Sequence, residues 1–163
     1  MQFTSKPALA AWIFGGVLLD QASKMMARAV LVPGKASVYL DGIFRIQMVQ
    51  NRGAFLSLGS TLPESARQAI LVIGVGVFVV GLLWYLFHST TTTPETRFAL
   101  GLVAAGGTGN LIARAFFQGG VTDFLNLGVG SLRTGIFNVA DMYITFAVIF
   151  MVLGSLRKPK LAG

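Results

Sequence analysis

Residues 69–87 read AILVIGVGVFVVGLLWYLF, a run of nineteen residues without a charged side chain. A helix needs about 20 such residues to cross a hydrocarbon core about 30 Å thick. Trp84 and Tyr85, near the end of the run, belong to the residue types that are enriched where lipid headgroups meet water. The run therefore predicts a membrane-spanning helix over about residues 68–88, and it decides the fold class.

The composition of the whole chain also favours a bilayer as its solvent. Of 163 residues, 54% are hydrophobic and 12% are charged, and the mean hydropathy is +0.71. An average soluble domain has about 25% charged residues. Apolar segments at about 8–31, 98–117 and 136–156 predict three more spans. We expect an all-α membrane protein with four transmembrane helices, forming a single integral-membrane domain over residues 1–163.

The first apolar segment has a second interpretation. Lys6, an apolar stretch and then Ala27-Arg28-Ala29 resemble a cleavable signal peptide. Such a peptide seldom carries charges like Asp20 and Lys24 inside its apolar stretch, and here three further spans follow. These features favour an uncleaved signal anchor.

The charge balance and the absence of cysteine exclude several classes of function. Without cysteine there is no disulfide framework, thiolate metal site or cysteine nucleophile. His88 is the single histidine, so we expect neither a metal nor another cofactor. The net charge is +7, but the cations are scattered between apolar runs. We therefore expect basic segments beside anionic lipid headgroups and no nucleic-acid partner.

Four spans would place both termini on one side of the membrane. The positive-inside rule hardly decides which side, because five Lys or Arg residues fall on each. The dense run Arg157-Lys158-Pro159-Lys160 follows the last span directly and favours a cytoplasmic C-terminus. We expect both termini in the cytoplasm.

The long connection between the first two spans has the pattern of a small sheet. Apolar residues alternate with Arg45 and Gln47 over residues 44–48, which is typical of a half-buried strand. Asp41-Gly42, between this segment and residues 38–40, is a hairpin signal. We expect an extramembrane β-sheet between helices 1 and 2 that lies on the bilayer.

Glycines recur in two of the predicted spans. They are Gly74, Gly76 and Gly81 in the second span, and Gly101, Gly106, Gly107 and Gly109 in the third. Small residues let helices approach closely in a membrane, so we interpret both sets as packing positions.

Three pairs of polar residues lie inside or beside apolar segments, where a charge costs at least ~2.5–3.5 kcal/mol. The pairs are Asp20 and Lys24 in the first span, Asn110 and Arg114 in the third, and Asn138 and Asp141 in the fourth. The first two pairs lie late in spans of the same direction, and the last lies early in a span of opposite direction. All three therefore fall near one membrane face, and each pair shares one helical face.

Asp123 and Asp141 have no cation beside them in the sequence. Asp123 follows the third span and Asp141 opens the fourth, so a hairpin between these helices could bring them together. Two carboxylates in a low-dielectric site do not easily both ionise. One can then deprotonate a water that attacks an amide carbonyl, while the other protonates the leaving amine. Asp20 and Lys24 are instead expected to form a structural or substrate-shaping ion pair.

Five segments carry these polar residues in order along the chain: DQASK at 20–24, NRGAF at 51–55, GGTGNLIAR at 106–114, VTDF at 121–124 and FNVAD at 137–141. In order and spacing they resemble the motifs of the lipoprotein signal peptidases, the type II signal peptidase family. The resemblance covers about residues 12–156.

The resemblance implies an aspartyl endopeptidase of the bacterial inner membrane that cleaves prolipoproteins before a cysteine carrying diacylglyceryl. It implies a catalytic pair on Asp123 and Asp141, near the outer face, with the sheet cradling the substrate. It implies substrate-binding or site-supporting roles for Asp20, Lys24, Asn51, Asn110, Arg114 and Asn138. The implied partners are diacylglyceryl-modified prolipoproteins, membrane lipids and a cyclic peptide antibiotic that blocks the dyad.

The chain departs from the family pattern at two positions, and two other functions stay open. Ala113 stands where the family usually has an acid, and Ala54 is a single alanine where two are common. The first departure fits a catalytically weak relative that only binds lipoproteins. Intramembrane acids also build the proton relays of small proton-coupled transporters, although such acids would span the membrane rather than crowd toward one face.

Overall fold

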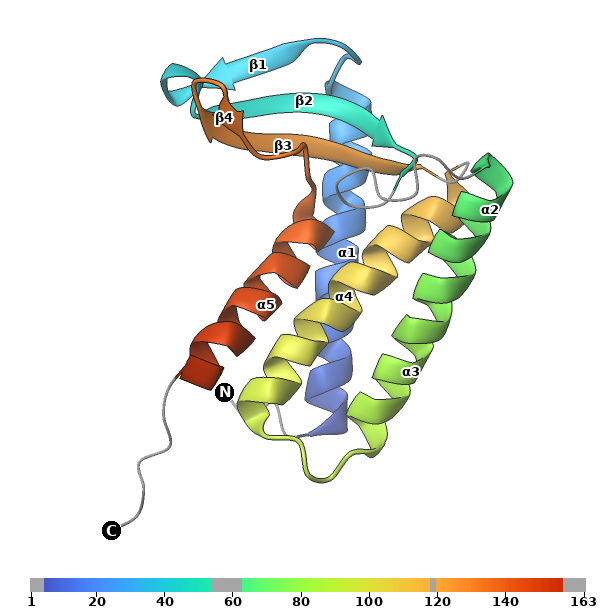
Figure 1. Ribbon diagram of the computed structural model, residues 1–163. Coiled ribbons are helices and arrows are strands. Elements are labelled where there is room, and N and C mark those ends of the chain that lie inside the picture. The colour runs from blue at the N-terminus through green and yellow to red at the C-terminus, as the bar shows by residue number, and fades with distance from the viewer. Residues whose placement is uncertain (1–4, 54–62, 118–119, 157–163) are drawn as a thin grey trace.

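A computed structural model describes residues 5–53, 63–117 and 120–156 of the chain. Long helices lie side by side, and a small sheet lies across one end of them (Figure 1). The helices are α1 Lys6–Val30, α4 Pro94–Phe116, α5 Val139–Leu156, and a continuous rod made of α2 Glu64–Ala69, the π-helical turn η3 Ile70–Gly74 and α3 Val75–His88. The mostly helical part of the predicted fold class is confirmed.

Three helices among the described residues are long and apolar enough to cross a membrane. They are Glu64–His88, Pro94–Phe116 and Val139–Leu156. They correspond to the spans predicted at 68–88, 98–117 and 136–156, with starts that differ by a few residues. The fourth predicted span, at 8–31, forms the helix α1 and is not one of these three.

Helix starts follow from local capping chemistry. Ser5 precedes α1, and its side chain accepts a hydrogen bond from the backbone N–H of Ala8. Thr93 precedes α4 and accepts one from the backbone N–H of Thr96. A proline lies in the first turn of each helix, where the backbone N–H that proline lacks would have no intrahelical acceptor.

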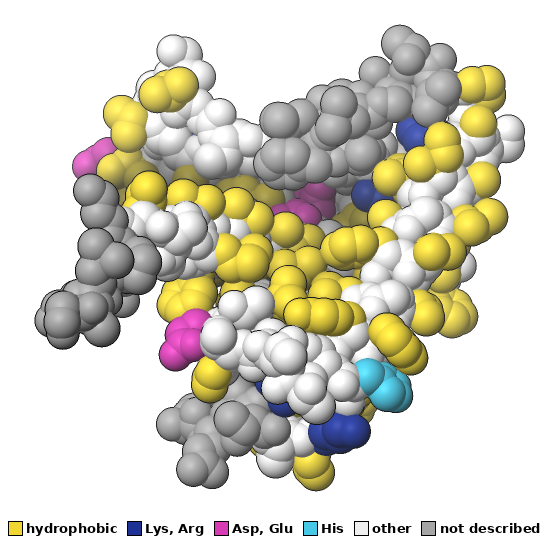
Figure 2. Space-filling model, turned by 60° about the horizontal axis from the view of Figure 1, so that its bottom comes forward, with side chains coloured by type: hydrophobic (Ala, Val, Ile, Leu, Met, Phe, Trp, Pro, Cys, Tyr) yellow, Lys and Arg dark blue, Asp and Glu magenta, His cyan; other side chains and the backbone are white. Residues whose placement is uncertain are grey.

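The burial pattern is the reverse of that of a water-soluble bundle. Apolar side chains such as Phe14 and Val77 are 64% and 70% exposed on the outside of the helices. The charged side chains of Asp20 and Lys24 are 0% exposed. Figure 2 shows the hydrophobic side chains spread over the helix surfaces. An apolar exterior around buried charges fits lipid as the surrounding solvent.

Helix α4 packs against α1, α3 and α5, and its glycines permit the close approach. A Cβ atom at Gly106 would lie 2.5 Å from the carbonyl oxygen of Ala140 in α5. This confirms the interpretation of the glycines in the third predicted span. Gly74 and Gly81 of the second span have nothing within 4 Å of such an atom, so for these two the interpretation was wrong.

The sheet has four antiparallel strands in the order β1-β2-β3-β4. The strands are β1 Ala36–Tyr39, β2 Phe44–Asn51, β3 Val121–Val129 and β4 Leu132–Arg133. The hairpin predicted around Asp41-Gly42 is confirmed, and both residues have positive φ. The prediction missed half of the sheet, because β3 and β4 lie between α4 and α5 rather than between helices 1 and 2.

Candidate active site

Asp123 lies in β3 and is 2% exposed. Its Oδ2 accepts a hydrogen bond of 2.9 Å from the side-chain amide of Asn51 in β2. Its Oδ1 accepts one of 2.6 Å from the side-chain amide of Asn138, which directly precedes α5. The Asp123 carboxyl group is therefore the point where β3, β2 and the start of α5 meet.

A β-bulge brings Asn51 to this position. Ile46 pairs with Leu125, but Val49 pairs with Asp123, so β2 has one residue more than β3 between these pairs. Because side chains alternate between the faces of a strand, this extra residue shifts the following residues to the opposite face. Asn51, and not its neighbour Gln50, then shares the face of Asp123.

Asp141 lies in the first turn of α5 and makes reciprocal contacts with Asn138. Its Oδ2 accepts from the backbone N–H of Asn138, and its own N–H donates to Oδ1 of Asn138, both at 3.1 Å. This is the geometry of a capping box. The other carboxylate oxygen of Asp141, Oδ1, accepts a 2.9 Å hydrogen bond from the side-chain amide of Asn110 in α4. The positive end of the helix dipole also favours a negative charge here.

One residue, Asn138, thus contacts both aspartates that the sequence singled out. It is 1% exposed, and its side-chain amide also donates a 3.3 Å hydrogen bond to Asn110. In Figure 2, acidic side chains are visible at the back of a hollow, with hydrophobic and basic side chains near them. Among the described residues, no group of three His, Cys, Asp or Glu side chains could hold a metal ion.

The predicted ion pair of α1 is present and reaches the same network. The ammonium of Lys24 donates to Oδ2 of Asp20 and to Oδ1 of Asn110, both at 2.8 Å. An ammonium group can only donate, so it fixes the orientation of the Asn110 amide. The oxygen faces Lys24, and the nitrogen is left to donate to Asp141.

Asp20 also contacts the start of α5 directly. Its Oδ1 accepts a 3.0 Å hydrogen bond from the backbone N–H of Ala140, one of the N–H groups that a helix start leaves without an intrahelical partner. Gln21 donates to Oδ2 of Asp20 and to the carbonyl of Gly109. Gln21 was not predicted as a site residue, although its place inside the DQASK segment was a signal.

Arg114 connects α4 with the segment that directly follows β2. Its guanidinium donates a 2.8 Å hydrogen bond to the carbonyl oxygen of Gly53. Ala113, the next residue in the sequence, is 1% exposed, so this position is enclosed. Ala54, Phe55 and the basic tail from Arg157 lie outside the described residues.

Burial raises the pKa of Asp123 to about 6 from its ordinary value of 3.8. The hydrogen bonds from Asn51 and Asn138 act in the opposite direction, the charge of Asp141 raises the pKa further, and Lys24 lowers it. Desolvation is the largest of these effects. The Asp123 carboxyl group therefore keeps its proton to a higher pH than an ordinary aspartate does.

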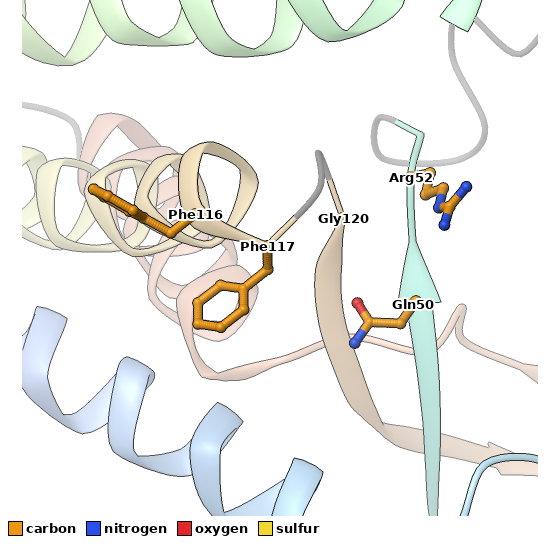
Figure 3. Close-up of a pocket in the computed structure, with 5 residues that line it drawn as sticks. All are labelled: Gln50, Arg52, Phe116, Phe117 and Gly120. Carbon is orange, nitrogen blue, oxygen red and sulfur yellow. The ribbon is translucent and has the colours of Figure 1, made fainter.

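A second polar group lies on the opposite face of the same strands. Thr122 is 1% exposed and accepts hydrogen bonds of 3.0 Å from Arg28 and from Gln50. The guanidinium of Arg28 also lies 4.1 Å from the centre of the Phe117 ring. A cavity of about 300 Å³ adjoins this group, and Figure 3 shows the residues along it: Gln50, Arg52, Phe116, Phe117 and Gly120.

The chain matches a family model described as signal peptidase (SPase) II over residues 12–157. It is 32% identical to the lipoprotein signal peptidase of Syntrophus aciditrophicus (strain SB), covering 95% of this chain and 97% of that protein. It is 34% identical to the lipoprotein signal peptidase of Paraburkholderia phymatum, covering 94% of each chain.

The fold is also similar to that of a solved protein. A bacterial membrane enzyme, determined by the in meso method at 2.3 Å resolution, superposes with a TM-score of 0.80 at 21% identity. The match covers 97% of this chain and 93% of the other. At this identity the likeness concerns the fold. By the family match, the chain belongs to the signal peptidase II family of membrane peptidases that process lipoproteins.

Proposed function

We propose that this chain is an aspartyl endopeptidase that removes signal peptides from diacylglyceryl-modified prolipoproteins. It cleaves on the amino side of the lipidated cysteine. The observation that carries the proposal is that Asp123 and Asp141 both accept hydrogen bonds from the buried Asn138, Asp123 from its side-chain amide and Asp141 from its backbone N–H. Two carboxyl groups held by a common partner form an acid and base pair that needs no covalent intermediate.

The proposed reaction begins with one ionised and one protonated aspartate. The ionised group takes a proton from a water molecule, whose oxygen bonds to the scissile carbonyl carbon. The protonated group donates its proton to the leaving nitrogen as the C–N bond breaks. The products are a new carboxyl group on the signal peptide and a free amine on the cysteine. Asp123 is the proton donor in this scheme, because its pKa is raised to about 6, so this carboxyl group binds a proton more readily than an ordinary aspartate does.

The remaining polar residues position this pair. Lys24 and Asp20 hold Asn110 and the start of α5, and through them Asp141. Asn51 and Asn138 hold Asp123. Arg114 holds the end of β2 beside the site through the Gly53 carbonyl. These contacts support site-supporting roles for Asp20, Lys24, Asn51, Asn110, Arg114 and Asn138.

Helix α1 is the fourth transmembrane span in this proposal, and residues 1–163 form one domain. Its 25 residues extend about 37 Å, enough to cross a hydrocarbon core about 30 Å thick. Asp20 and Lys24 face the bundle and are fully buried, so neither charge meets lipid. Both termini are cytoplasmic, and the site lies near the outer face.

This depth suits a lipid-modified substrate. The acyl chains stay in the hydrocarbon region, and the scissile bond beside the modified cysteine is then held near the headgroups. Membrane lipids surround the helices and the acyl chains of the substrate. A cyclic peptide antibiotic that occupies the dyad would block the same site.

The test is cleavage of a diacylglyceryl-modified prolipoprotein peptide in detergent, followed by mass spectrometry. The wild type should cut before the modified cysteine, whereas Asp123→Asn and Asp141→Asn should not. Asp41→Asn, the same change at an exposed aspartate of the hairpin turn, is the matched control and should cut at the wild-type rate. Full activity in either dyad variant would end the assignment.

A further inference from the structure

The side chain of Thr122, the residue before Asp123 in β3, is held by two other elements of the fold. Successive side chains of a strand point to opposite faces, so Thr122 lies on the face opposite Asp123. It is 1% exposed, and its hydroxyl oxygen accepts hydrogen bonds of 3.0 Å from Arg28 of α1 and from Gln50 of β2. A hydroxyl oxygen has two lone pairs, so these donors use its whole accepting capacity.

The flat guanidinium of Arg28 makes two different contacts at this place. Its Nη1 donates to Thr122, and its Cζ lies over the ring of Phe117, 4.1 Å from the ring centre. Figure 3 shows the Phe117 ring on the α1 side of the end of α4, and Gln50 pointing from β2 toward β3. The carbonyl of Phe117 accepts a 3.0 Å hydrogen bond from the backbone N–H of Gly120, directly before β3. Arginine can donate in its plane and stack with its face at the same time, so one side chain joins α1 to the end of α4 and to β3.

The two elements that hold Thr122 also reach the network around the aspartates. Asn51, the residue of β2 that follows Gln50, donates to Asp123. Lys24 lies four residues before Arg28 in α1 and therefore shares its helical face. Its ammonium reaches the network through Asn110. Helix α1 and strand β2 thus each supply one contact to the network of the aspartates and one to the opposite face of β3.

Two more general roles for Arg28 do not account for its orientation. It lies in the last turn of α1, where the helix dipole favours a cation, and arginines at a membrane surface commonly extend toward headgroups. Neither role requires the guanidinium to turn inward. Arg28 is half-buried, and in the part of the chain that the structure describes it forms no ion pair. Its contacts with Thr122 and Phe117 are therefore what orient it.

We propose that Arg28 is a positioning residue for Asp123, acting through the hydroxyl group of Thr122. Its hydrogen bond prevents β3 from sliding or twisting between β2 and the ends of α1 and α4. Such a movement would displace the Asp123 carboxyl group from Asp141 and from the scissile bond. A displacement of about 1 Å in a catalytic group can lower a rate by about 100-fold. The inference rests on the proposed catalytic role of Asp123.

The test measures kcat and KM for the lipidated peptide with full-length variants in detergent, per amount of folded protein. Thr122→Val keeps the shape of the side chain and removes the acceptor, whereas Thr122→Ser keeps the hydroxyl group. Arg28→Met removes the donor, and Arg28→Lys keeps the charge and a donor but loses the flat surface against Phe117. Arg97→Met is the matched control, because it removes a guanidinium that donates a 2.8 Å hydrogen bond to the carbonyl of Ser89, at the opposite end of α4 from the site.

We expect Thr122→Val and Arg28→Met to lower kcat by at least about tenfold and to change KM by less than about twofold, because the substrate still binds while Asp123 is displaced. Thr122→Ser and Arg97→Met should keep the wild-type kcat, and Arg28→Lys should fall between the wild type and Arg28→Met. Thr122→Val and Arg28→Met remove the same hydrogen bond from its two ends, so either variant decides the question if the other does not fold.

Three results overturn the proposal. They are a wild-type kcat in folded Thr122→Val or Arg28→Met, a change confined to KM, and equal losses in Thr122→Ser and Thr122→Val, which would show a packing role only. Asp123→Asn, measured alongside, separates this inference from the proposed function. If Asp123→Asn is inactive and Thr122→Val is fully active, the positioning role alone fails. Full activity of Asp123→Asn would end the proposed function as well.

Discussion

Lys24 is a fully buried cation whose contacts decide how two other residues are oriented. Its ammonium satisfies one oxygen of Asp20 and directs the amide of Asn110 toward Asp141. A buried carboxylate that loses its cation is costly, because neither water nor another charge replaces the partner. The residue thus links the stability of α1 to the geometry of the site.

Replacing Lys24 should therefore reduce both stability and turnover. Lys24→Met leaves Asp20 buried without its cation, and we expect a loss of about 3 kcal/mol in the free energy of unfolding. Denaturation in detergent measures this loss. Lys35→Met, the same change at an exposed lysine, should stay within about 0.5 kcal/mol of the wild type. Equal stability of the two variants would contradict the network.

The raised pKa of Asp123 predicts a pH dependence of stability. The folded protein holds a proton that the unfolded chain releases at about pH 4. The stability that this proton contributes is present at low pH and is lost as the pH rises through about 6. The Tm of Asp123→Asn minus that of the wild type should therefore increase between about pH 4 and about pH 7. A constant difference over this range would mean that Asp123 titrates as an ordinary aspartate.

Ala113 leads to a prediction that separates a full enzyme from a weak relative. The position is 1% exposed, so an acid there would be shielded from water. If the dyad alone sets the rate, Ala113→Asp should change kcat for the lipidated peptide by less than about threefold, which is under 1 kcal/mol. An increase of tenfold or more would show that the absence of an acid at position 113 weakens this chain as a peptidase.

At the scale of elements, the close packing of α4 against α5 brings the start of α5 beside the site residues of α4. Gly106 lets the backbone of Ala140 approach α4, one residue before Asp141. Gly106→Ala should lower stability by roughly 1–3 kcal/mol, because the new methyl group would overlap a backbone carbonyl that cannot move freely. Gly81→Ala is the matched control, since its methyl group meets nothing within 4 Å and alanine favours the helix. Thermal unfolding of both variants in detergent compares them directly, and equal destabilisation would contradict this packing.

Some elements were predictable from the sequence and others were not, for physical reasons. Strand β2 alternates between apolar and polar residues over positions 44–48, so its period of two is visible in the sequence. The first four residues of β3, Val121 to Phe124, are all buried, and burial on both faces removes the alternation. The second span begins at Glu64 rather than near residue 68, because a helix can continue past the apolar run.

Some contacts of the site were likewise predictable from the sequence, and others were not. The pairs Asp20 with Lys24 and Asn138 with Asp141 follow from helical spacing alone. The contact between Asn51 and Asp123 depends on a bulge within Gln-Met-Val, a segment without the glycine that often marks such a feature. A tertiary register of this kind cannot be derived from local sequence.

At the scale of the whole molecule, the polar groups are concentrated at one end of an apolar bundle. Helix α4 packs against α1, α3 and α5 and carries both Asn110 and Arg114 into the site. The sheet covers the same end and supplies Asn51 and Asp123. We propose that Asp123 and Asp141, supplied by a strand and a helix, act there as one catalytic unit.

The most direct test is kcat/KM for the lipidated peptide, measured for Asp123→Asn, Asp141→Asn and the variant with both changes. Groups that act as a unit lose nearly everything when one of them is removed. We predict that each single variant loses at least roughly 10³-fold, and that the double variant is no slower than the slower single variant. Two single losses that multiply in the double variant, or near-wild-type activity in either single variant, would contradict the account.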